Sequence, residues 1–578
     1  MMNSNIHRYW DRVQLALPWV FPLLLIVPNV ALACTEHVPA LYKLVNIVLP
    51  LGVYYLIMSI TKRTALVVLL CFPLSFFAAF QIVLLFLYGG GVLAVDMLLN
   101  VVTTNATEVS ELLMNMFWAM FWVVVLYIPP IVWAIWKLFQ KDKRLSMLRL
   151  RPLRITGDCI ASVGLVLLLG CYTVYPKYRA SRELFPVNVG FNIAEAYQRE
   201  GLSRHWPGTS QNFSYHASTT RPADEREIYV MVIGETARAD NWQLLGYDRP
   251  TTPRLAQREG LVGYPFTMSE SNTTHKSVPM LMSWLDSRTF GDSIAYTKGI
   301  ISAFNDAGYE TGFYSTQHPN NSYIDYFGKE ASTAHFLIFE DSLKTDADML
   351  AHLRSFIASA QAPKLFVVMH TYGSHFNYLD RVPAEFAYFP DHKYLSASPS
   401  ARTQLINAYD NTIYYTDYLL DGLIQELEDT GLPAALIYAS DHGEDIYDDQ
   451  RGRFLHASPT PTYYQLHVPM VVWMSSAYRA EHPEAYKQAQ AHQAMDASST
   501  QALFHTTLDL AGIKSPYFRA IESLINPAYK EPMRLYTTDH NEGVPVSQSG
   551  WDTPDDEMLE LLELKHSNLR YGPSPHLQ

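Results

Sequence analysis

Cysteine is scarce in this sequence of 578 residues, and it is confined to the first third of the chain. The four cysteines are Cys34, Cys71, Cys159 and Cys171, and none follows position 171. A scaffold held together by disulfides is therefore excluded for the long C-terminal part. That part must rely on a hydrophobic core of its own.

Charged residues are also few. They make up 17% of the chain, against 49% hydrophobic and 13% aromatic residues, which excludes a disordered coil as the main state. Residues 1–176 hold 12 Lys and Arg against 7 Asp and Glu, and because the whole chain carries −13, residues 177–578 carry −18. An acidic C-terminal part argues against nucleic acid as a partner, since the nucleic-acid backbone is itself negatively charged.

The basic first third contains five long segments without Asp, Glu, Lys or Arg. A helix needs roughly 20 residues to cross the hydrocarbon core of a membrane, and each segment is long enough or nearly so. We therefore predict a transmembrane domain of five helices over residues 1–176. A cleaved signal peptide is the alternative for the first segment, but four apolar segments follow it. The segments are 13–35, 44–61, 64–95, 112–136 and 159–176.

The loops between these segments differ in charge. Arg8 and Arg12 precede the first segment, Lys62 and Arg63 join the second to the third, and seven Lys and Arg lie between positions 137 and 154. Cytoplasmic loops collect Lys and Arg. The N-terminus is therefore predicted to be cytoplasmic, and the chain after the fifth helix is predicted to be exported.

Residues 177–225 show no sustained periodicity and are predicted to form a bridging segment. Two interpretations of its aromatic residues stay open. They belong either to short surface helices or to an interfacial segment on the membrane, because aromatic side chains favour the depth of the lipid headgroups. They include Tyr178, Phe185, Phe191, Tyr197 and Trp206.

Short apolar runs alternate with helical stretches over residues 226–578. The runs 228–233, 365–369, 435–439 and 468–473 are typical of strands covered on both faces, and residues 401–429 have helical spacing. This pattern predicts an α/β domain with a mainly parallel sheet covered by helices. Ligands are then expected at the carboxyl ends of the strands.

Polar side chains follow three of these runs. Glu235 follows the first, a segment with two histidines, 370–375, follows the second, and Asp441 and His442 follow the third. Each histidine alone is more often structural, but their repeated placement at strand ends favours a metal site. Mixed imidazole and carboxylate ligands favour zinc, with manganese as an alternative, over magnesium or calcium.

Four motifs occur in a specific order along the chain. They are Ile-Gly-Glu-Thr-Ala-Arg-Ala-Asp at 233–240, Gly-Tyr-Asp-Arg-Pro-Thr-Thr-Pro at 246–253, Thr-His-Lys-Ser-Val-Pro-Met at 274–280 and Ser-Asp-His-Gly-Glu at 440–444. Together they resemble the signatures of membrane phosphoethanolamine transferases of the sulfatase and alkaline-phosphatase superfamily. The resemblance covers almost the whole chain. It implies a multi-pass protein of the inner membrane whose catalytic domain, 226–578, lies in the periplasm.

The resemblance also implies a metal site and a nucleophile. Glu235, Asp441 and His442 match the zinc ligands of the family, and Thr274 matches its nucleophilic threonine, which is itself bound to the metal. Zinc lowers the pKa of such a hydroxyl and makes it reactive at neutral pH. One tightly bound zinc is expected, and a second in the working state is an open alternative.

The residues around Thr274 favour a different interpretation when they are taken alone. Thr274 then caps a helix that begins near Ser277. Only the match to the family selects Thr274 over Thr236 or Thr273 as the nucleophile.

Three further histidines fall in motifs of the family. His375 and His456 resemble ligands of a second zinc, or groups that position the substrate and stabilise charge on the transferred phosphorus. For His467, a structural hydrogen bond is the alternative. Lys276 is expected to contact substrate, although an ion pair explains it equally well.

A motif in the second outer loop contains Asn105 and Glu108. The resemblance implies that it binds substrate, with a carboxylate that receives the ammonium group of the donor lipid. The alternative is a capping box, in which Asn105 and Glu108 satisfy the first turn of a helix. Both descriptions are compatible, because a cap fixes a side chain without preventing contact with a ligand.

The resemblance implies zinc-dependent transfer of phosphoethanolamine from phosphatidylethanolamine, through a phosphothreonine intermediate, to lipid A or lipopolysaccharide core. The expected partners are the donor lipid, lipopolysaccharide and the membrane, and a monomer is expected. The chain departs from better-known members at Phe376-Asn377, in the absence of a lysine at 316–321 and in the lack of cysteines in the exported domain. These departures leave the acceptor open.

Two other functions remain as alternatives. One is a phosphoglycerol transferase of similar architecture, and the other is a membrane sensor or scaffold without turnover. A sulfatase is disfavoured, because the exported domain lacks the Cys/Ser-x-Pro-x-Arg sequence from which formylglycine is made.

Overall fold

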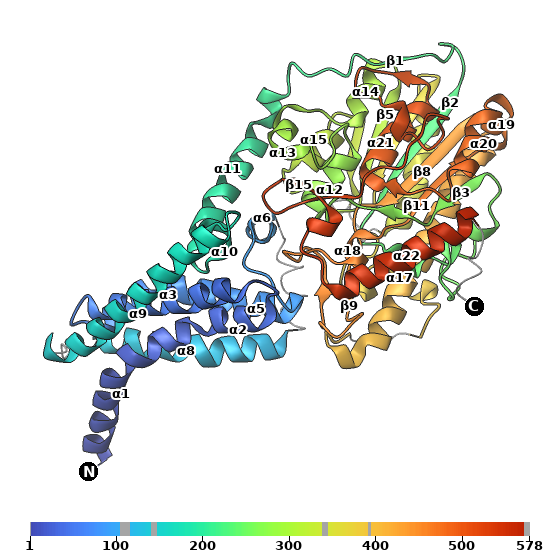
Figure 1. Ribbon diagram of the computed structural model, residues 1–578. Coiled ribbons are helices and arrows are strands. Elements are labelled where there is room, and N and C mark those ends of the chain that lie inside the picture. The colour runs from blue at the N-terminus through green and yellow to red at the C-terminus, as the bar shows by residue number, and fades with distance from the viewer. Residues whose placement is uncertain (1, 104–115, 140–146, 338–344, 391–394, 572–578) are drawn as a thin grey trace. The chain divides into compact units, whose positions relative to one another are not determined.

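The computed structural model describes residues 2–103, 116–139, 147–337, 345–390 and 395–571. The chain forms two compact units, one from residues 1–198 and 451–453 and the other from residues 199–450 and 454–578. Figure 1 shows that the first is helical and that the second is built around a sheet. Each unit is described by itself.

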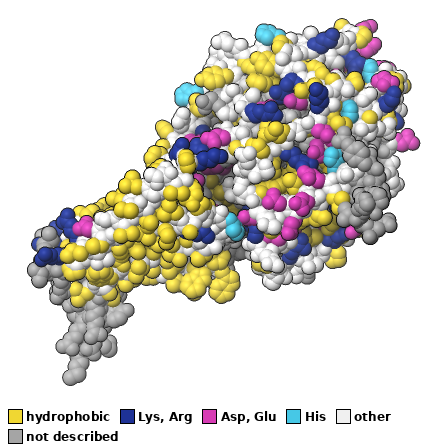
Figure 2. All heavy atoms as spheres, viewed as in Figure 1, with side chains coloured by type: hydrophobic (Ala, Val, Ile, Leu, Met, Phe, Trp, Pro, Cys, Tyr) yellow, Lys and Arg dark blue, Asp and Glu magenta, His cyan; other side chains and the backbone are white. Residues whose placement is uncertain are grey.

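The first unit contains the apolar helices predicted from the sequence. Segments Val13–Thr35, Ala40–Ser59, Trp118–Phe139 and Leu150–Val174 are each long and apolar enough to cross a membrane. Thr64–Leu70 and Phe72–Tyr88 form a pair bent by 53°, which makes a fifth span if the pair crosses as one. Hydrophobic side chains cover most of the visible surface of this unit (Figure 2). Four or five apolar N-terminal helices, as the fold class predicts, are thus present, while the bounds 1–176 stay a prediction. All four cysteines of the chain are free thiols.

The helices of this unit are α1 (Met2–Leu25), α2 (Val27–Thr35), α3 (Ala40–Ser59), α4 (Thr64–Leu70), α5 (Phe72–Tyr88), α6 (Val95–Thr103), α8 (Phe117–Phe139), α9 (Met147–Val174) and α10 (Ala180–Glu183). Helix α11 (Val187–Thr209) begins in the first unit and continues into the second.

A seven-stranded sheet forms the centre of the second unit. The strand order is β3-β11-β8-β2-β7-β5-β6, and the five strands from β8 to β6 are parallel. The run 468–473 was expected in the same parallel arrangement, but β11 is antiparallel to both of its neighbours. The strands are β2 (Glu227–Gly234), β3 (Leu261–Tyr264), β5 (Glu310–Ser315), β6 (Thr333–Phe336), β7 (Lys364–His370), β8 (Ala434–Ser440) and β11 (Met470–Met474).

Helices cover both faces of this sheet. Alternate residues of β2 point to opposite faces, as the pleat requires. Met231 packs in one hydrophobic core with α12 (Thr274–Leu281), α14 (Ile300–Asp306) and α21 (Ser499–Leu510). Val230 packs in the other with α16 (Met349–Ser359) and α17 (Arg402–Asp429). The α/β fold with a mainly parallel, helix-covered sheet is thus confirmed, and the predicted helix 401–429 is α17.

Candidate active site

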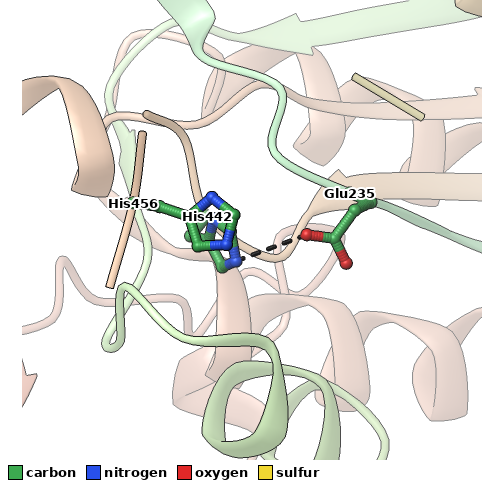
Figure 3. Close-up of side chains that lie close together, drawn as sticks. All are labelled: Glu235, His442 and His456. Carbon is green, nitrogen blue, oxygen red and sulfur yellow. Dashed lines mark ion pairs between the residues drawn. The ribbon is translucent and has the colours of Figure 1, made fainter. Parts of the chain in front are cut away.

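The carboxyl ends of β2 and β8 bring a carboxylate and a histidine together. Glu235 follows β2 and His442 follows β8, and both are buried. His456 comes from the loop after β10 (Phe454–Leu455), and its ring centroid lies 4.2 Å from that of His442. One ligand atom from each of the three side chains lies within 4.8 Å of the others. Figure 3 shows Glu235 facing the two histidine rings.

Thr274 is the first residue of α12, and its hydroxyl lies in this cluster. Its Oγ1 is 3.2 and 3.4 Å from the two carboxylate oxygens of Glu235 and 3.1 Å from His442 Nε2. The alternative of a cap for a helix beginning near Ser277 is therefore wrong. The helix begins three residues earlier, and Thr273 occupies the N-cap position.

Asp441 also belongs to the cluster, and it follows directly after β8. Its Oδ1 accepts from the amides of Thr236 and His442, and its Oδ2 accepts from the hydroxyl of Ser277 at 3.0 Å. Burial raises the pKa of Asp441 to about 7. Burial also raises the pKa of Glu235, and the neighbouring charge of Asp441 adds to that effect.

His442 presents an acceptor atom to these carboxylates. Its Nδ1 lies 3.0 Å from the Gly443 carbonyl, which can only accept, so Nδ1 carries the proton and Nε2 a lone pair. Nε2 is 3.3 Å from Asp441 Oδ2 and 3.4 Å from Glu235 Oε1. Burial lowers the pKa of His442, which keeps the ring neutral. Three acceptor atoms thus face one another, an arrangement that a bound cation stabilises.

His375 extends the cluster beyond β7. Its ring centroid lies 5.5 Å from that of His456, and its Nδ1 is 2.7 Å from the Phe376 carbonyl. The same reasoning places the proton on Nδ1 and leaves Nε2 available. The structure therefore brings together six of the predicted site residues, namely Glu235, Thr274, His375, Asp441, His442 and His456.

Two buried atoms on facing side chains have no hydrogen-bond partner among the described residues. They are His456 Nδ1 and Glu444 Oε2, which lie 3.8 Å apart. The other oxygen of Glu444 accepts from the Tyr378 hydroxyl at 2.6 Å. Burial raises the pKa of Glu444 and lowers that of His456. Glu444 therefore faces one ring nitrogen of His456, burial favours the uncharged form of both side chains, and only Nε2 remains for a partner in the cluster.

Other predicted residues have structural partners. His467 lies 2.7 Å from Asp240 Oδ2 through Nδ1 and 2.8 Å from the Pro265 carbonyl through Nε2, which supports its structural interpretation. The buried Lys276 ammonium donates to the Thr538 carbonyl at 2.8 Å. Its predicted contact with substrate stays a prediction. Asn105 and Glu108 lie outside the described residues.

Sequence reasoning missed the residues that orient the cluster. The Gln317 amide donates to Glu235 Oε2 and to the Thr371 carbonyl, both at 2.9 Å. Gln317 lies in the segment 316–321, where a lysine was sought. Glu444 lies in the motif at 440–444, but nothing in the sequence indicates that this glutamate faces a histidine. Tyr378 is one of many tyrosines, and only the fold shows its partner.

A sulfatase family model matches residues 227–513, which contain every cluster residue described above. This segment is similar to sulfatase-family domains. Phosphoethanolamine transferase EptA of Salmonella typhimurium is 28% identical over 322 residues, which are 53% of this chain and 56% of that relative. The match thus spans little more than half of that relative's length. The predicted resemblance to phosphoethanolamine transferases is nevertheless confirmed, and it agrees with the prediction of an enzyme.

Two solved structures share the fold of this chain. The integral membrane lipooligosaccharide phosphoethanolamine transferase A of Neisseria meningitidis matches with a TM-score of 0.70 and 22% identity, over 89% of this chain and 99% of that one. The periplasmic domain of Escherichia coli EptC, solved as a complex with Zn, matches with a TM-score of 0.51 and 22% identity, over 57% of this chain and 95% of that one. Both matches agree with the fold described above, an apolar helical part followed by a domain built around a sheet.

Proposed function

We propose that this protein transfers phosphoethanolamine from phosphatidylethanolamine to lipid A or the lipopolysaccharide core. The observation that carries the proposal is the position of the Thr274 hydroxyl, 3.1 Å from His442 Nε2 and 3.2 Å from Glu235. A hydroxyl that lies among buried side chains able to bind a metal is placed to act as a nucleophile, because a bound metal or an adjacent base activates it. The named activities of the relatives support the transferred group, and the Neisseria protein's lipooligosaccharide supports the class of acceptor.

Zinc is the metal that this donor set fits best. One imidazole nitrogen, two carboxylates and one hydroxyl would hold it, from His442, Glu235, Asp441 and Thr274. When bound, zinc lowers the pKa of a ligating hydroxyl and stabilises negative charge on a phosphoryl group. The three acceptor atoms that face one another support this assignment.

The chain's own residues account for the movement of atoms and protons. The Thr274 hydroxyl donates to Glu235, which accepts its proton as Oγ1 attacks phosphorus. The bond from phosphorus to Oγ1 forms, the bond to the diacylglycerol oxygen breaks, and that oxygen takes a proton from solvent. The lone pair on Nε2 of the half-buried His375 then accepts the proton of the attacking acceptor hydroxyl. An acceptor hydroxyl or phosphate then attacks the phosphothreonine, and Thr274 leaves with a proton returned from Glu235.

The intact mass of the full-length protein after incubation with donor lipid tests this proposal. Phosphatidylethanolamine is expected to leave one phosphoethanolamine on the wild type and none on Thr274→Ala. A phosphoglycerol adduct from phosphatidylglycerol would instead select a phosphoglycerol transferase. The absence of any adduct in zinc-loaded protein, with both lipids supplied, would reject covalent transfer and favour a sensor or scaffold.

Glu444 provides a prediction about metal binding. A metal held by His456 Nε2 would require the ring proton on Nδ1 and Glu444 as the carboxylate that accepts it. In Glu444→Gln the amide NH₂ can face Nδ1 instead, which places the ring proton on Nε2, the nitrogen on the cluster side. Carboxylates that orient metal-binding histidines typically contribute about 10–100-fold in metal affinity or activity. We expect a loss of that size in the affinity for a second zinc that His456 would hold, measured by competition with a chelator.

Tyr378→Phe is the matched control for this prediction. It removes the hydroxyl that donates to the other oxygen of Glu444 and leaves the carboxylate facing His456 in place. Its loss of zinc affinity should be smaller than that of Glu444→Gln. Wild-type zinc affinity in Glu444→Gln would show that the carboxylate does not orient His456.

A further inference from the structure

The first half of α11 turns polar side chains toward the protein. Asn188 and Asn192 are buried, and their amides donate to the Leu93 carbonyl at 2.9 and 2.8 Å. Val189 and Ala196 share this buried side. All of these contacts lie within the first unit.

The opposite side of the same helix is apolar and exposed. Over residues 187–198, all of which the structure describes, the exposed side chains are uncharged. A helix on the surface of a soluble protein has the reverse polarity, with its apolar stripe toward the core. The large apolar side chains on this side are Val187, Phe191, Ile193 and Tyr197, with exposed fractions of 43, 58, 42 and 79%.

The start of α11 is fixed to the ends of two membrane helices. The Phe185 amide donates to Asn46 Oδ1 of α3 at 3.1 Å, and Asn29 of α2 donates to the Phe185 carbonyl at 2.7 Å. Asn29 also donates to Asn46 Oδ1 at 3.0 Å. These contacts hold the first turns of α11 beside the membrane helices.

Tyrosine side chains form a cluster in the same unit. The ring of Tyr42 lies 5.1 Å from that of Tyr175 and 4.6 Å from that of Tyr178, and Tyr172 lies 5.4 Å from Tyr178. Clustered tyrosines at the end of a membrane helix are typical of the boundary between lipid and water. Exposed Lys177 and Arg179 follow in the chain, where they can meet lipid phosphates.

We propose that the exposed side of α11 from Val187 to Tyr197 is a lipid-binding surface that lies among the headgroups of the exported leaflet. Exposed apolar side chains are also present on the apolar helix α9, where Val166 and Leu169 are 68 and 65% exposed. The aromatic residues of the bridging segment then fall into two groups. Phe191 and Tyr197 face lipid, whereas Tyr178, Phe185 and Trp206 are buried in the protein.

Photocrosslinking of the full-length protein tests this surface. The photoreactive residue p-benzoylphenylalanine replaces Phe191 in protein reconstituted into vesicles of phosphatidylethanolamine and phosphatidylglycerol, and mass spectrometry identifies the adducts after irradiation. Lipid adducts are expected at position 191. The same residue in place of Val166 is the positive control. In place of Arg204, whose side chain is 72% exposed further along α11, it is expected to give no lipid adduct.

The outcome separates lipid from the other possible occupants. A crosslinked dimer at position 191 would assign this face to a second copy of the chain and overturn the proposal. So would the absence of lipid adducts at position 191 when position 166 gives them. Replacement of Tyr197 repeats the test if the variant at 191 does not fold. The readout does not depend on catalysis, so it stands apart from the proposed function.

Discussion

Replacement of Thr274 by alanine is expected to lower the rate of phosphoethanolamine transfer by about 10⁴-fold or more, as removal of a catalytic nucleophile does in other enzymes. The reason is geometric. Its Oγ1 lies 3.1 to 3.4 Å from the ligand atoms of Glu235 and His442, so the substitution removes the oxygen that forms the bond to phosphorus. The measurement is the initial rate of transfer from labelled donor lipid in detergent or vesicles.

Thr273→Ala is the matched control for this prediction. Thr273 precedes the nucleophile, and its hydroxyl lies 3.1 Å from that of Ser271 rather than in the metal cluster. It should keep most of the activity, and Thr274→Ser should keep a measurable part because it retains the hydroxyl. An active Thr274→Ala variant beside an inactive Thr273→Ala variant would show that the nucleophile has been assigned to the wrong residue.

The fold of this protein could be predicted where a single periodicity dominates a segment. The runs in β2, β7 and β8 are continuous and apolar because helices cover both faces of the sheet. Strand β5 reads Glu-Thr-Gly-Phe-Tyr-Ser and was missed. It forms a strand because its backbone pairs with β7 and β6, and no local pattern in the sequence reveals this pairing.

The candidate site was predicted to the extent that its residues follow strands. The ends of β2 and β8 are followed directly by Glu235 and by Asp441 and His442. These side chains therefore meet at the carboxyl edge of the sheet. Thr274 and His456 come from a helix start and a loop, and only the family resemblance identified them. Gln317, Tyr378 and Glu444 act through contacts with other side chains, and such contacts become visible only when the chain has folded.

Replacement of Asp441 by asparagine is expected to abolish zinc binding and yet stabilise the metal-free protein. Without metal, two buried carboxylates and the lone pair of His442 Nε2 face one another. An asparagine amide can donate to His442 Nε2 and to Ser277, which are 3.3 and 3.0 Å from the present oxygen. Its oxygen still accepts from the amides that now reach Oδ1.

The pH dependence of this effect follows from the pKa of Asp441. Burial raises that pKa to about 7 in the folded metal-free protein, whereas it is about 3.9 in an unfolded chain. The folded state therefore holds a proton more tightly, and stability is lost as pH rises from about 4 through 7. Asparagine does not titrate, so its advantage grows over that range and is constant above it.

Thermal unfolding of chelator-treated protein at pH 5 and pH 8 measures this advantage, which we expect to reach about 4 kcal/mol at pH 8, the free energy of a difference of about three pKa units. Asp417→Asn is the control with the opposite expected sign, which its hydrogen-bond donors decide, because burial raises the pKa of Asp417 too, to about 6. Asp417 is also buried, but its oxygens accept from the amides of Arg254 and Leu255 and from the Arg254 guanidinium at 3.1 Å. An amide NH₂ placed against those donors should destabilise the protein.

Added zinc should raise the Tm of the wild type and leave that of Asp441→Asn unchanged, because a ligand stabilises only a protein that binds it. Lower stability of Asp441→Asn than of the wild type, in metal-free protein at pH 8, would contradict this account. It would mean that the carboxylate is already balanced within the protein. The acceptor atoms around His442 Nε2 would then not repel one another enough to favour a bound cation. The zinc assignment would fail.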